Sequence, residues 1–182
     1  MTAESDHVLP ADVMRLYALI GSIASCWSHL EQSVDVTVWW LAGLNHLKGP
    51  CITAQIQSLR SKIFALVALL DLHCESQPLI DAINKFSGEA DKVVRRRNRA
   101  VHDPISSADG EEPVAVTITA QRKLTYGLFK GTMAKYVETE RQIVSLLETY
   151  IELDQQIRSK FDERSRPPLK PIWQRGIRDD GN

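Results

Sequence analysis

The chain has 182 residues, of which 43% are hydrophobic and 25% charged, and its formal net charge is −1. This length and composition predict a single globular domain. A net charge so close to zero excludes a protein that coats nucleic acid through its overall charge, so any recognition of phosphate must come from a local cluster of basic residues.

The cysteines and the apolar runs indicate the compartment. Cys26, Cys51 and Cys74 are odd in number, widely spaced and set within apolar helical patterns, which is typical of small buried hydrophobes in a reducing compartment. The longest apolar run, residues 63–70, is too short to cross a bilayer, and the first residues have no signal-peptide pattern. We therefore expect a cytoplasmic protein.

Apolar residues at three- and four-residue spacings predict four long helices. The first covers residues 12 to about 47, as one helix or two closely joined ones, and a Leu-Lys-Gly-Pro segment at 47–50 ends it. The second covers residues 52–73, the third runs from about 78 to 102, and the fourth covers 133–161. Residue 97, an arginine, falls on the apolar stripe of the third helix.

Between the third and fourth helices the pattern changes. Residues 105–113 have the composition of a loop, and β-branched alternation at 114–119 and 123–128 predicts a small hairpin over about 113–129. The expected fold is mainly α, an antiparallel up-and-down bundle of four or five helices with this hairpin inserted. Residues 1–10 are expected to form a flexible N-terminus, 11–162 one helical domain and 163–182 a Pro- and Arg-rich tail. The wide apolar faces predict a homodimer.

The end of the third helix carries a distinctive cluster, Arg95-Arg96-Arg97-Asn98-Arg99-Ala100-Val101-His102-Asp103-Pro104. Arg97 lies on the apolar seam, where an unpaired charge is costly. Asn98 and His102 are four residues apart and so share one face of the helix, which Asp103-Pro104 then ends. A phosphate-gripping cation, an orienting amide and a group that titrates near neutrality therefore meet at one helix end, which favours work on a phosphodiester.

With these helices and this cluster, the chain resembles the HEPN superfamily. HEPN domains are compact helical bundles marked by an arginine, a polar residue and a histidine a few positions on. The match here is the six-residue Arg-x4-His segment from Arg97 to His102, with Asn98 in the polar slot, at the C-terminal end of the third long helix. As architecture, the resemblance covers roughly residues 13–161.

The resemblance implies a metal-independent endoribonuclease, of a kind often found as a toxin or defence effector, with the motifs of two protomers facing each other across a dimer cleft. Arg97 and His102 would then be the central catalytic pair and Asn98 the auxiliary residue. Glu31, on the inward stripe of the first helix, resembles the acidic residue that family members often carry near the motif. A carboxylate there needs a partner, and the predicted partner is Arg97.

The expected chemistry needs no cofactor and no metal, and no two histidines have the spacing of a metal site. The RNA 2′-hydroxyl would attack the adjacent phosphorus, with histidine, whose ordinary pKa is about 6.5, as base and acid. Arg97 would hold the phosphate with its planar fork of donors. Four more cations would form the approach surface for the RNA, with salt-sensitive binding: Lys92, Arg95, Arg96 and Arg99.

Other interpretations of the same residues remain open. The chain could be a non-catalytic HEPN-like dimerisation, interaction or nucleotide-binding module, or a nucleic-acid-binding regulator. The arginine run could be a solvated helix end, His102 could cap the helix, and the pair of Arg97 and Glu31 could only fix helix register. The toxin interpretation also allows for a cognate antitoxin or regulatory protein as partner.

Overall fold

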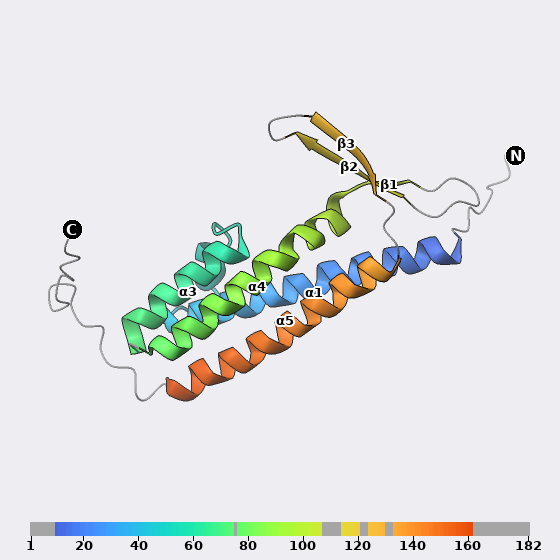
Figure 1. Cartoon of the computed structure of the whole chain (residues 1–182). Helices are drawn as coiled ribbons and strands as arrows, with labels where there is room; N and C mark the ends of the chain where they lie inside the picture. The colour runs from blue at the N-terminus through green and yellow to red at the C-terminus, as the bar shows by residue number, and fades with distance from the viewer. Residues whose placement is uncertain (1–9, 75, 107–113, 121–123, 130–132, 162–182) are drawn as a thin grey trace, which may run out of the picture. The chain divides into compact units, whose positions relative to one another are not determined.

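The computed structural model describes residues 10–74, 76–106, 114–120, 124–129 and 133–161 (Figure 1). This part of the chain is mainly helical. Its five helices are α1 (Ala11–Leu41), α2 (Gly49–Thr53), α3 (Leu59–Cys74), α4 (Gln77–His102) and α5 (Met133–Lys160). The predicted C-terminal tail and, apart from Pro10, the predicted flexible N-terminus lie outside the described residues.

The chain divides into two compact units, and the three boundaries between them all fall inside helices, in α1, α4 and α5. Unit 1 consists of Met1–Gln32 and Gly88–Thr149, and unit 2 of Ser33–Ser87 and Tyr150–Asn182. Unit 1 thus holds the first part of α1, the last part of α4, the strands and the first part of α5. Unit 2 holds the remaining helical segments, including all of α2 and α3.

Each unit is a small helical bundle with its own apolar core. The three- and four-residue spacing of apolar residues puts one stripe of each helix inward. In unit 1 the most buried side chains are those of Leu16, Ile23, Trp27, Leu30 and Ile143. In unit 2 they are those of Val34, Ile63, Leu66, Leu70, Ile83, Tyr150 and Ile157.

The helix directions in unit 2 exclude the four-helix form of the predicted up-and-down bundle and fit the five-helix form, in which the first and last helices run parallel. In unit 2, Thr37 bonds to Asp154 and Trp40 packs edge-on against Phe161, so α1 and α5 run parallel. By contrast, Phe86 packs against Tyr150, while Lys160 donates to Ser76 just before α4, so α4 runs opposite to α5.

The segment between α1 and α3 explains these directions. The first helix ends six residues earlier than predicted, because Gly43 has φ 70° and the amides of Gly43 and Leu44 donate back to the carbonyls of Trp40 and Trp39. These two bonds form the Schellman motif, which glycine favours. The predicted second helix is interrupted, since α3 begins only after Ser58, whose hydroxyl accepts from the amide of Ser61 as an N-cap. The chain returns between these two signals, so α3 starts again in the direction of α1.

A small antiparallel sheet follows α4 in unit 1. Strands β1 (Ile105–Ser106), β2 (Val114–Ala120) and β3 (Leu124–Phe129) pair in the order β1-β2-β3, with Ile105 opposite Ala115 and Ala115 opposite Phe129. Strands β2 and β3 lie within the range predicted for the hairpin. Strand β1 falls in the predicted loop, because two residues are too few to show an alternating pattern.

The cysteines differ from the prediction of small buried hydrophobes. Cys26 is half-buried and Cys51 is exposed, and both are free thiols. Cys51 lies on the short helix α2, where its thiol contacts the Leu47 carbonyl oxygen one turn earlier at 3.5 Å. The prediction is wrong for Cys51. Helix α2 has only five residues, and its buried positions are Gly49 and Thr53, so Cys51 lies on the face turned to solvent.

Candidate functional site

The cluster singled out in the sequence occupies the last three turns of α4, in unit 1. Val93 and Ala100 are buried on the inward stripe of this helix, and Arg97, one turn after Val93, is half-buried between them. The side chains of Arg95, Arg96, Asn98, Arg99 and His102 are exposed. The same periodicity that turns the valine and the alanine inward therefore draws one guanidinium group partly out of water.

Arg97 is held by an aromatic ring and an amide. Its guanidinium carbon lies 5.8 Å from the ring centroid of Trp27, a cation–π contact with a side chain that is 2% exposed. Its Nη1 donates to Oδ1 of Asn98 at 3.1 Å, and its Nε is buried without a hydrogen-bond partner. A buried donor left unsatisfied is uncommon and costs free energy.

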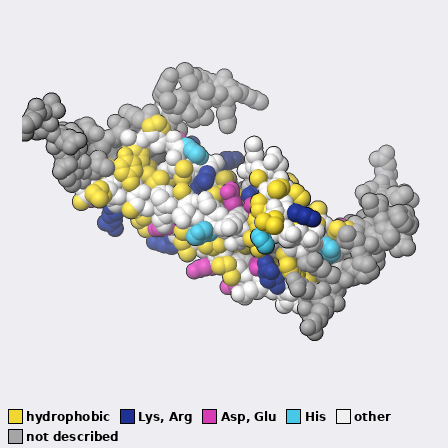
Figure 2. Space-filling view, turned by 180° about the vertical axis from the view of Figure 1, so that it is seen from behind, with side chains coloured by type: hydrophobic (Ala, Val, Ile, Leu, Met, Phe, Trp, Pro, Cys, Tyr) yellow, Lys and Arg dark blue, Asp and Glu magenta, His cyan; other side chains and the backbone are white. Residues whose placement is uncertain are grey.

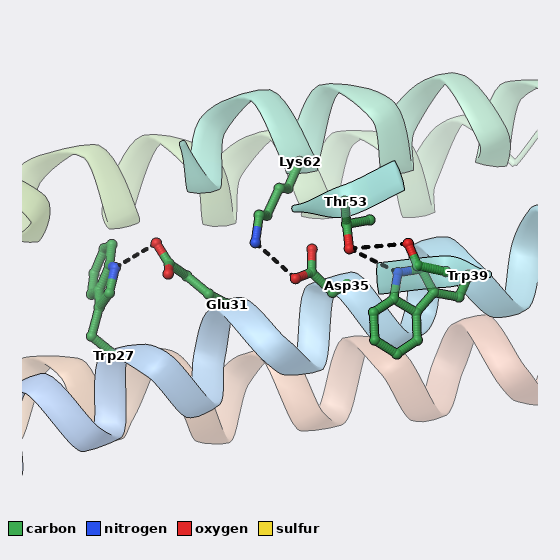
Figure 3. A network of polar contacts seen from close by, with 7 residues as sticks. Trp27, Glu31, Asp35, Trp39, Thr53 and Lys62 are labelled. Atoms are coloured by element: carbon green, nitrogen blue, oxygen red, sulfur yellow. Dashed lines mark hydrogen bonds and ion pairs between the residues drawn. The ribbon is translucent and has the colours of Figure 1, made fainter. Parts of the chain in front are cut away.

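The predicted pairing of Glu31 with Arg97 is wrong. Glu31 accepts a hydrogen bond from the Trp27 indole Nε1 at 2.9 Å, one helical turn away (Figure 3). Among the residues that the structure describes, no ion pair joins Arg97 to a carboxylate. The neighbour of Arg97 is therefore Trp27 and not Glu31. The buried Trp27 ring presents its π-face to the Arg97 guanidinium, and its indole N–H donates to Glu31. The four-residue spacing of Trp27 and Glu31 was the signal in the sequence.

Asn98 and His102 are exposed near the end of α4. Their four-residue spacing places them on one helix face, as the sequence predicts. His102 makes no hydrogen bond with any described residue, so the helix-capping role considered for it is not seen. Within one chain, the structure shows no contact between His102 and Arg97, and their five-residue separation puts them on different sides of the helix.

The predicted RNA-binding cations separate into two groups. Lys92 pairs with Glu89 on its own helix at 2.7 Å, and Arg95 is exposed to solvent. Arg96 and Arg99, in contrast, line a pocket of about 390 Å³ together with residues of α5. The residues of α5 that complete it were missed in the sequence: Lys135, Tyr136, Glu138 and Thr139. They stand 36 or more residues later in the chain, and no local pattern links them to the cluster.

The arrangement can bind and neutralise an anion and can transfer a proton. Arginine keeps its charge and presents donors in a planar fork, and an imidazole has one ring nitrogen that can accept a proton and another that can donate one. In the part of the chain that the structure describes, no three His, Cys, Asp or Glu side chains gather as a metal site would require. Nor does any helix there combine the length and the apolar character needed to cross a membrane.

Comparisons with models of protein families, with curated proteins and with solved structures gave no match to this chain.

Proposed function

We propose that the protein is a HEPN-like, metal-independent endoribonuclease whose site combines Arg97, Asn98 and His102 of two protomers. The observation that carries the proposal is the state of Arg97: its guanidinium lies on Trp27, bonds to Asn98 and has no carboxylate partner among the described residues. An arginine kept only to fix helix register would be expected to have its charge neutralised by an ion pair. This one retains its charge for an anion, which the phosphodiester of RNA supplies.

The proposed reaction transfers two protons and no electrons. One histidine takes the proton of the ribose 2′-hydroxyl as its oxygen bonds to phosphorus, and a second histidine gives a proton to the departing 5′-oxygen. The products are a 2′,3′-cyclic phosphate and a 5′-hydroxyl. Guanidinium donors stabilise the charge that develops on the phosphoryl oxygens, and each positioned acid or base contributes about a hundredfold to ten-thousandfold.

A second protomer is part of the proposal because one chain has one His102, and that residue does not contact Arg97. Apolar side chains are available for such an interface. Met14 is 56% and Tyr17 49% exposed on α1 in unit 1, the unit that holds the motif. Apolar side chains also reach the surface on the face shown in Figure 2, between charged ones. The proposed partners are therefore a second copy of the chain, RNA and, for a toxin or defence effector, a cognate antitoxin or regulatory protein.

The test is an RNA cleavage assay in the presence of a chelator, with each variant checked by thermal unfolding. We expect His102→Ala and Arg97→Ala each to lower the cleavage rate at least about a hundredfold, the lower end of the effect of one positioned catalytic group. His46→Ala is the matched control, because His46 is exposed in the segment between α1 and α2, in unit 2. Identical product patterns for wild type and His102→Ala would overturn the proposal. Unfolding of both variants would assign the motif a structural role instead.

A further inference from the structure

The pocket of about 390 Å³ in unit 1 lies where the last turns of α4 face the first turns of α5. Its size is within the range of small-molecule sites, about 300–1,000 Å³. Helix α4 supplies Arg96, Arg99 and Ala100, and helix α5 supplies Lys135, Tyr136 and Thr139 together with Glu138. The pocket is thus lined by seven residues from two helices, and the residues of α4 could not form it without those of α5.

The charges that line this pocket are mostly positive. Arg96, Arg99 and Lys135 are cationic, and Glu138 is the one carboxylate among the lining residues. Glu138 is already neutralised, because its Oε2 pairs with Nη1 of Arg141 at 2.8 Å. Three cations therefore outnumber the Glu138 carboxylate of the lining and the Asp103 carboxylate that acts on Tyr136, and the remaining positive charge favours an anionic ligand.

One of the two arginines is oriented before any ligand arrives. Nη1 of Arg96 donates to Oε1 of Gln142 at 2.7 Å, and Nε2 of the same glutamine donates to Glu138 at 2.9 Å. This chain of bonds ties the guanidinium on α4 to α5. It uses one of the five N–H donors of Arg96 and leaves the fork available for a planar or tetrahedral oxyanion.

The apolar and hydroxyl lining suits a ligand larger than an ion. Tyr136 is 8% and Ala100 7% exposed, so both form the wall of the pocket rather than its rim. Burial raises the pKa of the Tyr136 phenol above its ordinary value of 10.0, and Asp103 adds to the shift. The phenol is therefore a neutral donor at physiological pH, next to a methyl group small enough to leave space.

We propose that this pocket binds the phosphate and adjoining sugar of one nucleotide of the RNA strand, as a subsite beside the cleavage position. Arg96, Arg99 and His102 follow one another at three-residue spacing, so they form a continuous row on α4 from the pocket to the proposed proton-transfer group. Neighbouring phosphates of one strand would occupy the two ends of this row. The inference rests on the proposed endoribonuclease function and names the part of the substrate that this surface holds.

The experiment measures the binding of a fluorescein-labelled, 2′-O-methylated single-stranded RNA, which cannot be cleaved, by anisotropy at several salt concentrations. We expect Arg99→Ala and Lys135→Ala each to raise the dissociation constant about five- to twentyfold and to lower the salt slope by about one. Lys85→Ala removes an exposed charge from the same helix in unit 2 and should leave binding unchanged. Ala100→Leu fills the pocket without removing a charge and should also weaken binding.

Two outcomes would overturn the proposal that this pocket binds a nucleotide of the RNA. If Arg95→Ala weakens binding as much as Arg99→Ala, a diffuse basic surface binds the RNA and not this pocket. If uridine 3′-monophosphate displaces the RNA from wild type and from Arg99→Ala equally well, the subsite does not hold a nucleotide.

Failure of the pocket and failure of the nuclease are distinguishable by cleavage kinetics on unmodified RNA. Arg99→Ala should raise KM and leave kcat unchanged, whereas His102→Ala should lower kcat. Cleavage with a KM that is insensitive to Arg99 would refute the pocket alone. RNA binding that maps to the pocket without any cleavage by wild type would refute the nuclease and leave the binding site standing.

Discussion

Replacing Gly49 with a larger residue should destabilise the protein. Gly49 begins α2 in unit 2, and a Cβ atom built on it would lie 2.4 Å from two carbons of the Trp39 indole and 2.7 Å from a third. The same indole donates from Nε1 to Oγ1 of Thr53 at 2.9 Å, and Thr53 is 2% exposed (Figure 3). The indole therefore contacts both ends of α2 and has little freedom to move away.

Gly49→Ala should destabilise the protein by about 1–3 kcal/mol, the usual cost of forcing extra volume into a packed site. Loss of the Trp39–Thr53 hydrogen bond would add about 1 kcal/mol if the ring shifts. At roughly 2–4 °C per kcal/mol for a chain of this size, a loss of about 1–3 kcal/mol should lower the melting temperature by about 2–12 °C.

Circular dichroism during thermal and urea unfolding measures this effect, and the chain offers two matched controls. Gly88 and Gly21 lie in helices α4 and α1 with no atom within 4 Å of a built Cβ. Alanine at either position should stabilise the protein by about 0.5–1 kcal/mol through the lower entropy of the unfolded chain. The packing argument would be refuted if Gly49→Ala were as stable as wild type or matched the two controls.

Three further predictions concern unit 2. Ser58→Ala removes the acceptor for the Ser61 amide and should cost about 1 kcal/mol in urea unfolding; an unchanged midpoint would mean that Ser58 is not the cap of α3. Lys62→Ala leaves the half-buried Asp35 carboxylate without its 2.7 Å partner and should lower the free energy of unfolding by about 3 kcal/mol. The double variant with Asp35→Leu should recover part of this loss, and a loss below about 0.5 kcal/mol in the single variant would contradict the reasoning. Burial raises the pKa of the Tyr150 phenol, so the unfolded state loses its phenolic proton first, and stability should fall as pH rises above about 10. Tyr150→Phe should flatten that fall, and parallel pH profiles for the two proteins would refute the assignment.

The helices that could be predicted best are those with strong one-sided patterns. For α4, the spacing of Ile80, Ile83, Phe86 and Val93 predicts the inward face, and the structure buries all four. Its observed start at Gln77 and end at His102 lie within a residue of the prediction, because Pro78 fits a first turn and Pro104 disfavours continuation.

The helix ends that were predicted wrongly are those set by the backbone angle or the side-chain hydrogen bond of a single residue. Gly43 and Ser58 end α1 and begin α3, yet each is a common residue whose effect depends on its own φ angle or on one side-chain bond. Because these two signals were missed, the end of the first helix and the interruption of the second were not predicted. Neither residue alters the apolar spacing, so periodicity could not reveal them.

The site shows the same limit at the level of side chains. The sequence places Arg97 on the inward stripe, and the structure finds it half-buried, but its neighbour is Trp27 and not Glu31. Helical spacing predicts which residues share a face. It does not predict which of several inward residues on another helix will be nearest, and it contains no information on Lys135 and Tyr136, which reach the pocket from α5.

In the proposed reaction, Arg97 and His102 cut RNA through attack of the RNA's own 2′-hydroxyl on the adjacent phosphorus. The most direct measurement is the rate at which 2′,3′-cyclic phosphate ends form, in chelator, on an oligoribonucleotide and on the same oligonucleotide made with 2′-deoxyribose. We predict cyclic ends with wild type on the ribose substrate, at least about a hundredfold fewer with His102→Ala, and no cleavage of the deoxyribose substrate. Equal rates for wild type and His102→Ala, or cleavage of the deoxyribose substrate, would contradict the mechanism.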